Sequence, residues 1–219
     1  MPWRTPKTTA AASLQPLLYG DAPMSAWPPP DGDSTGEPWL RFAEARDLAE
    51  NGDLASAQRL WRQVAAMRGI EARHALQAWH FLRESGVAPP NEMAAQTLGA
   101  AAQVPVKSGH DVLVVYADGS VRYLNHSGMV AVVAPPAPED LATAAGEWLA
   151  IAEQLSNAIG PWTEPLPEVP RGHARVLMLT PSGPRFGQGP YDALSRDTAA
   201  GAFLQAATKA LQIVVRLAS

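Results

Sequence analysis

The chain lacks cysteine and is poor in charge, and each shortage excludes a class of protein. With no cysteine in 219 residues, disulfides, thiol nucleophiles and thiolate metal sites are excluded. Charged residues make up only 17% of the chain and its net charge is −4, so we expect no nucleic-acid partner. Because the histidines form no recognisable ligand cluster, we expect neither a metal site nor a cofactor.

Long hydrophobic runs are missing as well. No run reaches the ~18 apolar residues of a membrane-spanning helix. Thr, Pro and Lys interrupt residues 1–20, which leaves no apolar core of signal-peptide length. We therefore expect a cytoplasmic protein without a membrane partner. The 47% of hydrophobic residues suffice to bury a core, as one domain or one domain with a helical extension.

The most informative segment is residues 110–133, where three short apolar runs are separated by two polar tetrapeptides. The tetrapeptides 117–120 and 125–128 have turn chemistry, because Asp and Asn bond to their own backbone and Gly accepts positive φ. This pattern predicts an antiparallel meander of three strands. The first and third runs are apolar at almost every position, which indicates that both faces of the sheet are covered.

Helical spacing and flanking signals predict the other elements. Asp53 and Asp197 are well placed to cap helices that begin just after them. The expected helices are 38–50, 54–67, 70–84, 139–158 and 198–218, and the remaining expected strands are 96–106 and 174–180. Grouped strands with helices around them predict an α+β fold with a mainly antiparallel sheet of four or five strands.

Three regions differ in composition. Residues 1–37 are rich in proline, which resists both helix and sheet, and we predict a flexible tail with some apolar residues able to dock locally. Residues 38–90 are predicted to form a helical element packed on the body. Residues 91–219 are predicted to form the α+β core.

Two resemblances support this organisation. The size classes of Ala45, Leu48, Ala57, Trp61 and Val64 resemble one tetratricopeptide hairpin. Because arrays of such repeats need several units to bury their faces, we expect a single hairpin and no solenoid.

The second resemblance lies in the meander and its surroundings. The string YxDGxxRYxNxSG over 116–128, with GVxPP at 86–90 and SGxxFGxG at 182–189, resembles a family of uncharacterised bacterial proteins. The similarity covers about residues 38–217. It implies a single integrated domain and no particular activity.

Polar residues around the second turn of the meander are candidate ligand contacts, namely Arg122, Tyr123, Asn125 and His126. Arg122 could hold an anion and His126 could transfer a proton. The simpler interpretation is structural: Asn125 caps the turn, and Arg122 pairs with Asp118 or Glu147.

A loop predicted at 182–191 adds Arg185 and Gln188 to these candidates. A pocket between this loop and the turn 125–128 would make the protein a small-molecule sensor or an enzyme. The loop matches no phosphate-binding motif, and Ser182 lacks the flanking glycines of a nucleophile elbow. No residue is therefore assigned a catalytic role.

Tryptophan is abundant, with seven in the chain. Trp3, Trp27 and Trp162 lie in proline-rich segments, where an exposed indole could anchor a protein partner. These features favour a non-enzymatic interaction or accessory module of a soluble bacterial complex, with a protein partner and homodimerisation through the sheet or the last helix. The sensor or enzyme with the pocket described above is the alternative.

Overall fold

The computed structural model describes residues 14–28 and 36–218. Trp3 lies outside these residues. The helices are α1 (Gln15–Tyr19), η2 (Met24–Ala26), α2 (Trp39–Glu50), α3 (Leu54–Ala65), α4 (Ala72–Glu84), α5 (Asn91–Ala94), α6 (Glu139–Ala158), α7 (Tyr191–Arg196) and α8 (Thr198–Ala218). The strands are β1 (Gly99–Val106), β2 (Gly109–Tyr116), β3 (Val121–Leu124), β4 (Val130–Val133), β5 (His173–Thr180) and β6 (Gly183–Pro190).

The six strands form one antiparallel sheet in the order β4-β3-β2-β1-β5-β6. Strand β1 pairs with both β2 and β5, and so joins the predicted meander to the hairpin β5–β6. The predicted α+β class is confirmed, with six strands where four or five were expected. The extra strand is β6, which proline and glycine had marked as a loop. Its prolines are tolerated because β6 is an edge strand and needs partners on one side only.

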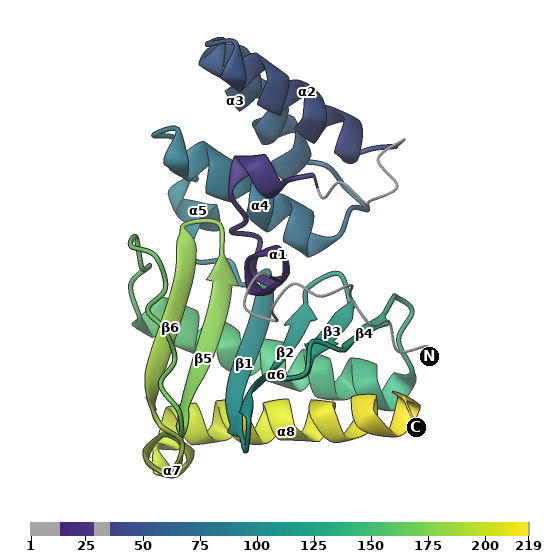
Figure 1. Cartoon of the computed structure of the whole chain (residues 1–219), viewed down its shortest axis with the longest axis vertical. Helices are drawn as coiled ribbons and strands as arrows, with labels where there is room; N and C mark the ends of the chain where they lie inside the picture. Colours follow the sequence, from purple (N-terminus) through teal and green to yellow (C-terminus); the bar gives the residue numbers. More distant parts are fainter. Residues whose placement is uncertain (1–13, 29–35, 219) are drawn as a thin grey trace.

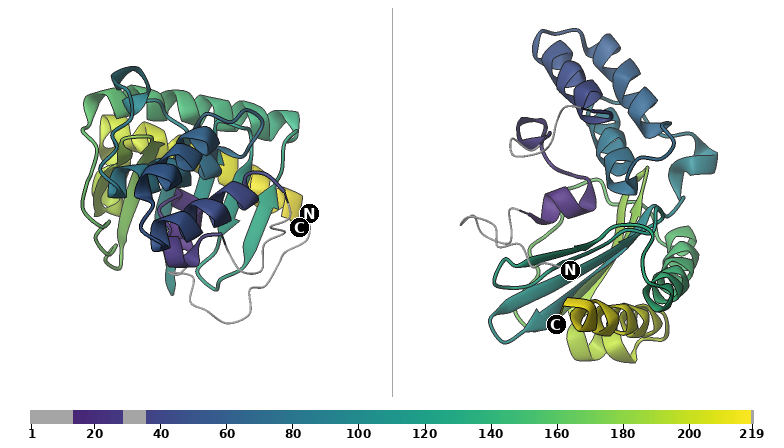
Figure 2. Two further views of the ribbon diagram at one scale, coloured as in Figure 1. Left: turned by 90° about the horizontal axis from the view of Figure 1, so that it is seen from above. Right: turned by 90° about the vertical axis from the view of Figure 1, so that its right-hand side faces the viewer.

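Helices α6 and α8 cover one face of the sheet, and α1 and α4 lie on the other side (Figures 1 and 2). The first core cluster packs Trp148 and Phe203 against strand residues such as Val115 and Met178. The second cluster, on the opposite face, includes Leu76 together with strand and α1 residues. The two-sided apolarity of the strands is explained by these two clusters.

Helices α2, α3 and α4 form a third layer at one end of the sheet (Figure 1). The predicted cap is present, because the Asp53 carboxylate accepts a hydrogen bond from the backbone nitrogen of Ser56 at 3.1 Å. Asp197 likewise accepts one from the backbone nitrogen of Ala200 at 2.8 Å, at the start of α8. The five long helices predicted from periodicity are confirmed to within a few residues at each end.

Within the predicted tail, residues 14–28 fold onto the body, and two of its apolar residues, Leu18 and Tyr19, dock there as expected. This segment forms α1 and η2, and the Gln77 side chain bonds both backbone groups of Ala22, at 3.0 and 2.8 Å. Trp27 is fully buried, with its ring 5.2 Å from that of Trp39 and 5.6 Å from that of Phe42. Proline keeps the helices of this segment short, but the apolar side chains of the segment still dock on the body of the protein. Trp27 is thus a core residue and no exposed anchor for a partner.

Candidate binding groove

Arg122 is engaged inside the protein. Its guanidinium pairs with the Glu71 carboxylate at 2.7 Å and lies 5.5 Å from the centre of the Tyr116 ring. Asp118, one of its predicted partners, instead accepts a hydrogen bond from the backbone nitrogen of Ala72 at 2.8 Å. Arg122 therefore ties the meander to the start of α4, and its charge is already compensated.

The other candidates on the meander also pair locally. The Asn125 side chain accepts hydrogen bonds from the backbone nitrogens of Ser127 and Met129, at 3.0 and 2.9 Å, and so caps its own turn as the simpler interpretation predicted. The Tyr123 hydroxyl and the His126 Nδ1 lie 2.5 and 3.0 Å from the two oxygens of the Asp111 carboxylate. Burial, reinforced by this hydrogen bond, raises the pKa of Tyr123. Of these candidates, only His126 borders the groove described below.

Arg185 lies on the other face of the sheet from Arg122. Arg185 pairs in register with Met178 of the α6–α8 core, whereas Arg122 pairs with Val114 of the opposite cluster. The Arg185 guanidinium binds two carbonyl oxygens at the C-terminal end of α6, those of Ser156 and Ile159. Arg122 and Arg185 therefore do not share a pocket, although His126 of the predicted turn and Ser182 and Pro184 of the predicted loop line the groove described next.

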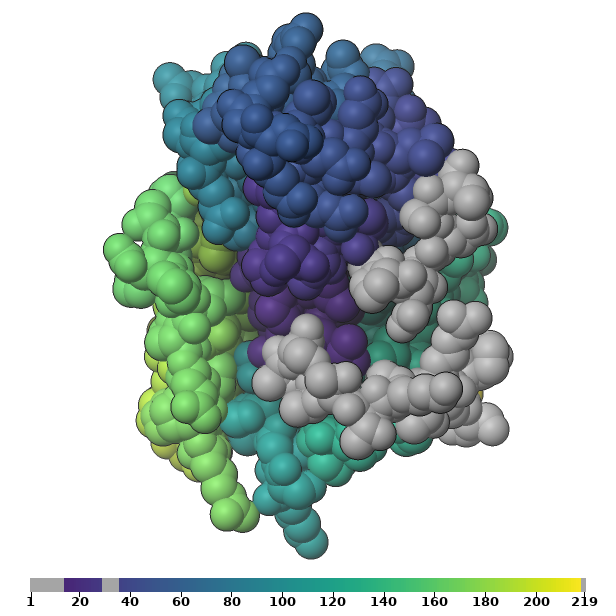
Figure 3. Space-filling view, turned by 45° about the horizontal axis from the view of Figure 1, so that its top comes forward, coloured from purple at the N-terminus to yellow at the C-terminus, as the bar shows by residue number. Residues whose placement is uncertain are grey.

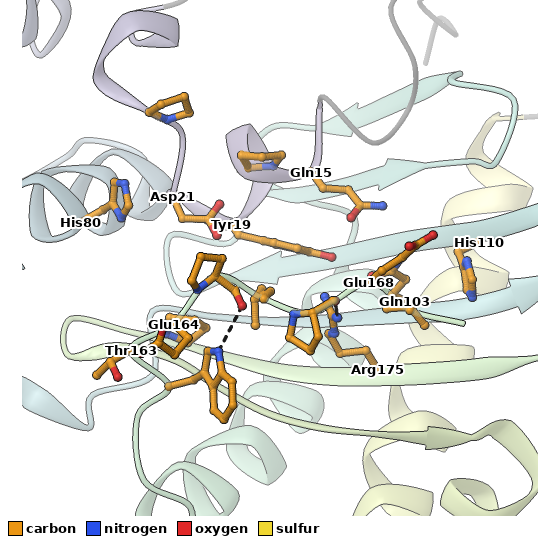
Figure 4. Close-up of a pocket in the computed structure, with 18 of the residues that line it drawn as sticks. Gln15, Tyr19, Asp21, His80, Gln103, His110, Thr163, Glu164, Glu168 and Arg175 are labelled. Atoms are coloured by element: carbon orange, nitrogen blue, oxygen red, sulfur yellow. Dashed lines mark hydrogen bonds between the residues drawn. The ribbon is translucent and has the colours of Figure 1, made fainter. Parts of the chain in front are cut away.

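A different hollow lies beside the sheet. It is a groove of about 1020 Å³. Its walls are α1 and the residues that follow α1, the C-terminal part of α4, and the segment 162–169, which we call the strap. The strap and α1 stand on either side of it (Figures 3 and 4). Trp162 is the first residue of the strap and is 42% exposed. Its ring lies 5.3 Å from that of Phe186, and its indole nitrogen donates a hydrogen bond to the Pro165 carbonyl oxygen at 3.3 Å.

The floor of the groove is polar. Gln103 of β1 and Arg175 of β5 are register partners, and both project into it (Figure 4). Arg175 is held by the Gln188 side-chain oxygen, which accepts from its Nε at 2.9 Å and its Nη2 at 2.6 Å. Gln188, a predicted ligand contact, thus positions Arg175 and is not itself among the groove's lining residues.

Three buried polar atoms of the groove lining have no hydrogen-bond partner. They are the Tyr19 hydroxyl, the Asp21 Oδ1 and the Gln103 Oε1. Tyr19 and Gln103 are each only 5% exposed. An unpaired buried polar atom costs about 1–3 kcal/mol, and these three, unpaired among the described residues, need partners that water or a ligand in the groove would supply.

The charges of the groove are unevenly compensated. Burial raises the pKa of Asp21 to about 7, although Arg83 and Arg175 act in the opposite direction. Burial also lowers the pKa of Arg83 to about 10. Among the described residues, neither arginine has a carboxylate within 4.0 Å. The exposed carboxylates of the lining are those of Glu84, Glu164 and Glu168.

Sequence reasoning missed the residues that matter most here. Gln103 and Arg175 did leave a signal, because each is a long polar residue inside an otherwise apolar strand. Tyr19 and Asp21 left none, since they lie in a segment that proline content assigned to a tail. Their convergence depends on the pairing of β1 with β5, which no local pattern reveals.

No family model, curated protein or solved structure matches the chain. Within residues 14–28 and 36–218, no group of three or more metal-binding side chains is gathered in one place. In the same part of the chain, no helix is both long enough and apolar enough to span a bilayer. The interpretation of the groove therefore depends on its own geometry.

Proposed function

We propose that the protein is a non-enzymatic interaction module, and that its groove binds an extended segment of a protein partner. The observation that carries this proposal is the set of unpaired buried atoms on Tyr19, Asp21 and Gln103 around one hollow. Each could complete its hydrogen bonding with the amide groups or side chains of a bound peptide.

The dimensions of the groove support a peptide. The register of the sheet gives the length of the groove. The lining residue His110 pairs with Pro105 of β1 near one end. Near the other end Leu179 pairs with Gly99 of β1, and the lining residue Ser182 lies beyond Leu179. At ~3.3 Å per strand residue, the ends of the groove are ~20 Å apart, the span of about six extended residues. A compact ligand would leave much of this length empty.

The walls favour recognition through side chains. Five lining residues are prolines, which have no N–H to donate: Pro16, Pro23, Pro165, Pro167 and Pro184. The walls are therefore poorly suited to add a strand by main-chain pairing. Selectivity would come from the polar side chains of the floor.

Among the hydroxyl groups of this groove, that of Ser182 most resembles a nucleophile, and its hydrogen bonds favour binding over catalysis. Ser182 donates its proton to the Ala94 carbonyl oxygen at 2.6 Å and accepts from Arg185 Nη2 at 3.1 Å. A hydroxyl committed in this way has no base to activate it. We also propose that the protein acts in the bacterial cytoplasm, that it has a protein partner and that it forms a homodimer.

The test is selection of random short peptides displayed on phage against the purified full chain. We expect enriched peptides to lose binding to a Gln103→Met variant, which removes the unpaired acceptor at little cost to folding. The matched control is Gln205→Met on the exposed side of α8, which should bind as the wild type does. Enrichment that survives Gln103→Met, or stabilisation by small metabolites with no peptide enriched, would overturn the proposal.

A further inference from the structure

We propose that the groove selects a partner segment carrying an acidic side chain, whose carboxylate is received by Arg175 and Arg83. This inference rests on the proposed function and names the chemistry of its ligand. Its basis is that two guanidinium groups line one hollow with only neutral acceptors to hold them.

The Arg175 guanidinium is held in place to donate hydrogen bonds to a ligand carboxylate. The residue is 3% exposed, and its side chain is fixed by the Gln188 amide oxygen, by the Pro167 carbonyl oxygen and by the Phe186 ring, 5.3 Å away. Its Nη1 makes no hydrogen bond within the described residues. Because the guanidinium is already immobilised, little side-chain freedom is lost when a carboxylate binds to it.

Arg83 lines the same groove from α4 and, like Arg175, acts electrostatically on Asp21. Its Nη1 donates to the Pro181 carbonyl oxygen at 2.6 Å, and within the described residues its other donors make no hydrogen bond. Burial weakens its hold on the proton, as the lowered pKa shows. A carboxylate ligand would restore the lost solvation of both arginines, and bonds between charged partners are the strong ones.

Asp21 fits this arrangement as a carboxyl group that donates a hydrogen bond when it is protonated. Its carboxyl faces both arginines electrostatically, and its pKa of about 7 leaves a large fraction protonated at neutral pH. The protonated group can donate to a bound carboxylate, whereas the ionised group competes with it. Around Asp21 stand Tyr19 and Arg175, with Arg83 from α4.

The exposed carboxylates of the groove lining favour basic flanks on the ligand. Glu84, Glu164 and Glu168 would attract Lys or Arg on either side of the inserted acid. The chain's own first 13 residues are a poor match, because they contain Arg4 and Lys7 but no acidic residue. Residues 29–35 carry Asp31 and Asp33 but lack the basic flanks, so the occupant is expected on another protein.

The experiment uses an array of immobilised peptides with random flanks and one fixed central residue. Labelled full-length protein is applied to sets in which that residue is Glu, Gln, Lys or Leu. We expect binding to the Glu set to exceed that to the isosteric Gln set by about tenfold. An Arg83→Gln variant should lose this preference, and the Arg185→Gln variant, changed on the other face of the sheet, should keep it.

The outcomes separate this inference from the function on which it rests. Equal binding of the Glu and Gln sets overturns the acidic preference and leaves peptide binding intact. Binding to none of the sets overturns both. A blocked single glutamate that competes as well as the peptides would mean that the groove takes a small carboxylate, and the peptide assignment would be wrong.

Discussion

His74 lies between the rings of Trp39 and Trp27, at 4.6 and 5.8 Å, and its Nε2 is 4.0 Å from the Glu71 carboxylate. Neither ring nitrogen makes a hydrogen bond within the described residues. Burial first, and then the neighbouring Arg73, lower its pKa from 6.5 to about 3, against the opposing effect of Glu71. Arg122 also lowers this pKa and Asp118 raises it, both to a smaller extent. The imidazole is thus a neutral core side chain of the helical layer.

The pH dependence of unfolding tests this state. Between pH 6.5 and about 3 the unfolded chain binds the His74 proton and the folded protein does not, so stability falls as the pH drops through this window. At about pH 5 the loss is about 2 kcal/mol. Urea unfolding at neutral and acidic pH should show a smaller loss for His74→Met than for the wild type. A His126→Met control should keep the full loss, and equal losses in all three would contradict a neutral His74.

Asp21 is expected to act with the opposite sign. Its pKa is about 7 in the folded protein against 3.8 ordinarily, so folding favours the protonated form and stability falls as the pH rises from 3.8 to 7. Asp21→Asn should therefore be more stable than the wild type above pH 7, on the order of 1–2 kcal/mol once partial solvent access is discounted. Urea unfolding at several pH values measures this difference. A variant that is less stable at alkaline pH would show that the carboxylate has a structural partner.

At the scale of elements, Arg185 is a helix cap. It supplies donors to the carbonyl oxygens of Ser156 and Ile159, which the last turn of α6 leaves without backbone partners. Arg185→Met should cost about 2 kcal/mol and lower Tm by about 4–8 °C, with peptide binding unchanged. Thermal unfolding and the peptide array measure the two effects. Lost binding at unchanged stability would instead restore a ligand role for Arg185.

The segment 14–28 is expected to be a structural part of the helical layer. Trp27 fills a site between Trp39, Phe42 and His74, so Trp27→Ala should cost about 3–5 kcal/mol. Deletion of residues 2–12 should leave Tm nearly unchanged, whereas deletion of residues 2–28 should lower it sharply. Circular dichroism melting of the three variants measures this. Equal melting of both deletions would mean that the segment contributes nothing to the fold.

Prediction from sequence succeeded where the signal is local. The caps Asp53 and Asp197 and the turn glycines marked where elements begin and end, and periodicity marked the long helices. It failed at β6 and α1, because proline content was read without the edge position or the docking surface that tolerates it. The division at residue 90 and the tetratricopeptide resemblance stay predictions.

At the scale of the whole molecule, the net charge of −4 gives no indication of where single arginines lie in the groove. Among the described residues, two arginines of its lining have no carboxylate within 4.0 Å, Arg175 on the floor and Arg83 on α4, and the strand pairing that places Gln103 beside Arg175 is non-local. Composition alone therefore led to the expectation of no nucleic-acid partner but gave no view of the arginine on the floor of the groove. In the part of the chain that the structure describes, the exposed large apolar side chains come one from each of six separate segments, which is ordinary for a monomer surface. Homodimerisation stays a prediction.

The most direct test of the groove is a nitrogen-15 NMR titration of the 23.3 kDa chain with a display-selected peptide. The Nε–H signals of Arg83, Arg175 and Arg185 are each assigned by an Arg→Lys variant. We predict that the signals of Arg83 and Arg175 shift together as peptide is added, while that of Arg185 stays in place. Backbone shifts confined to α2, α3 or β4, with all three arginine signals unmoved, would contradict the account.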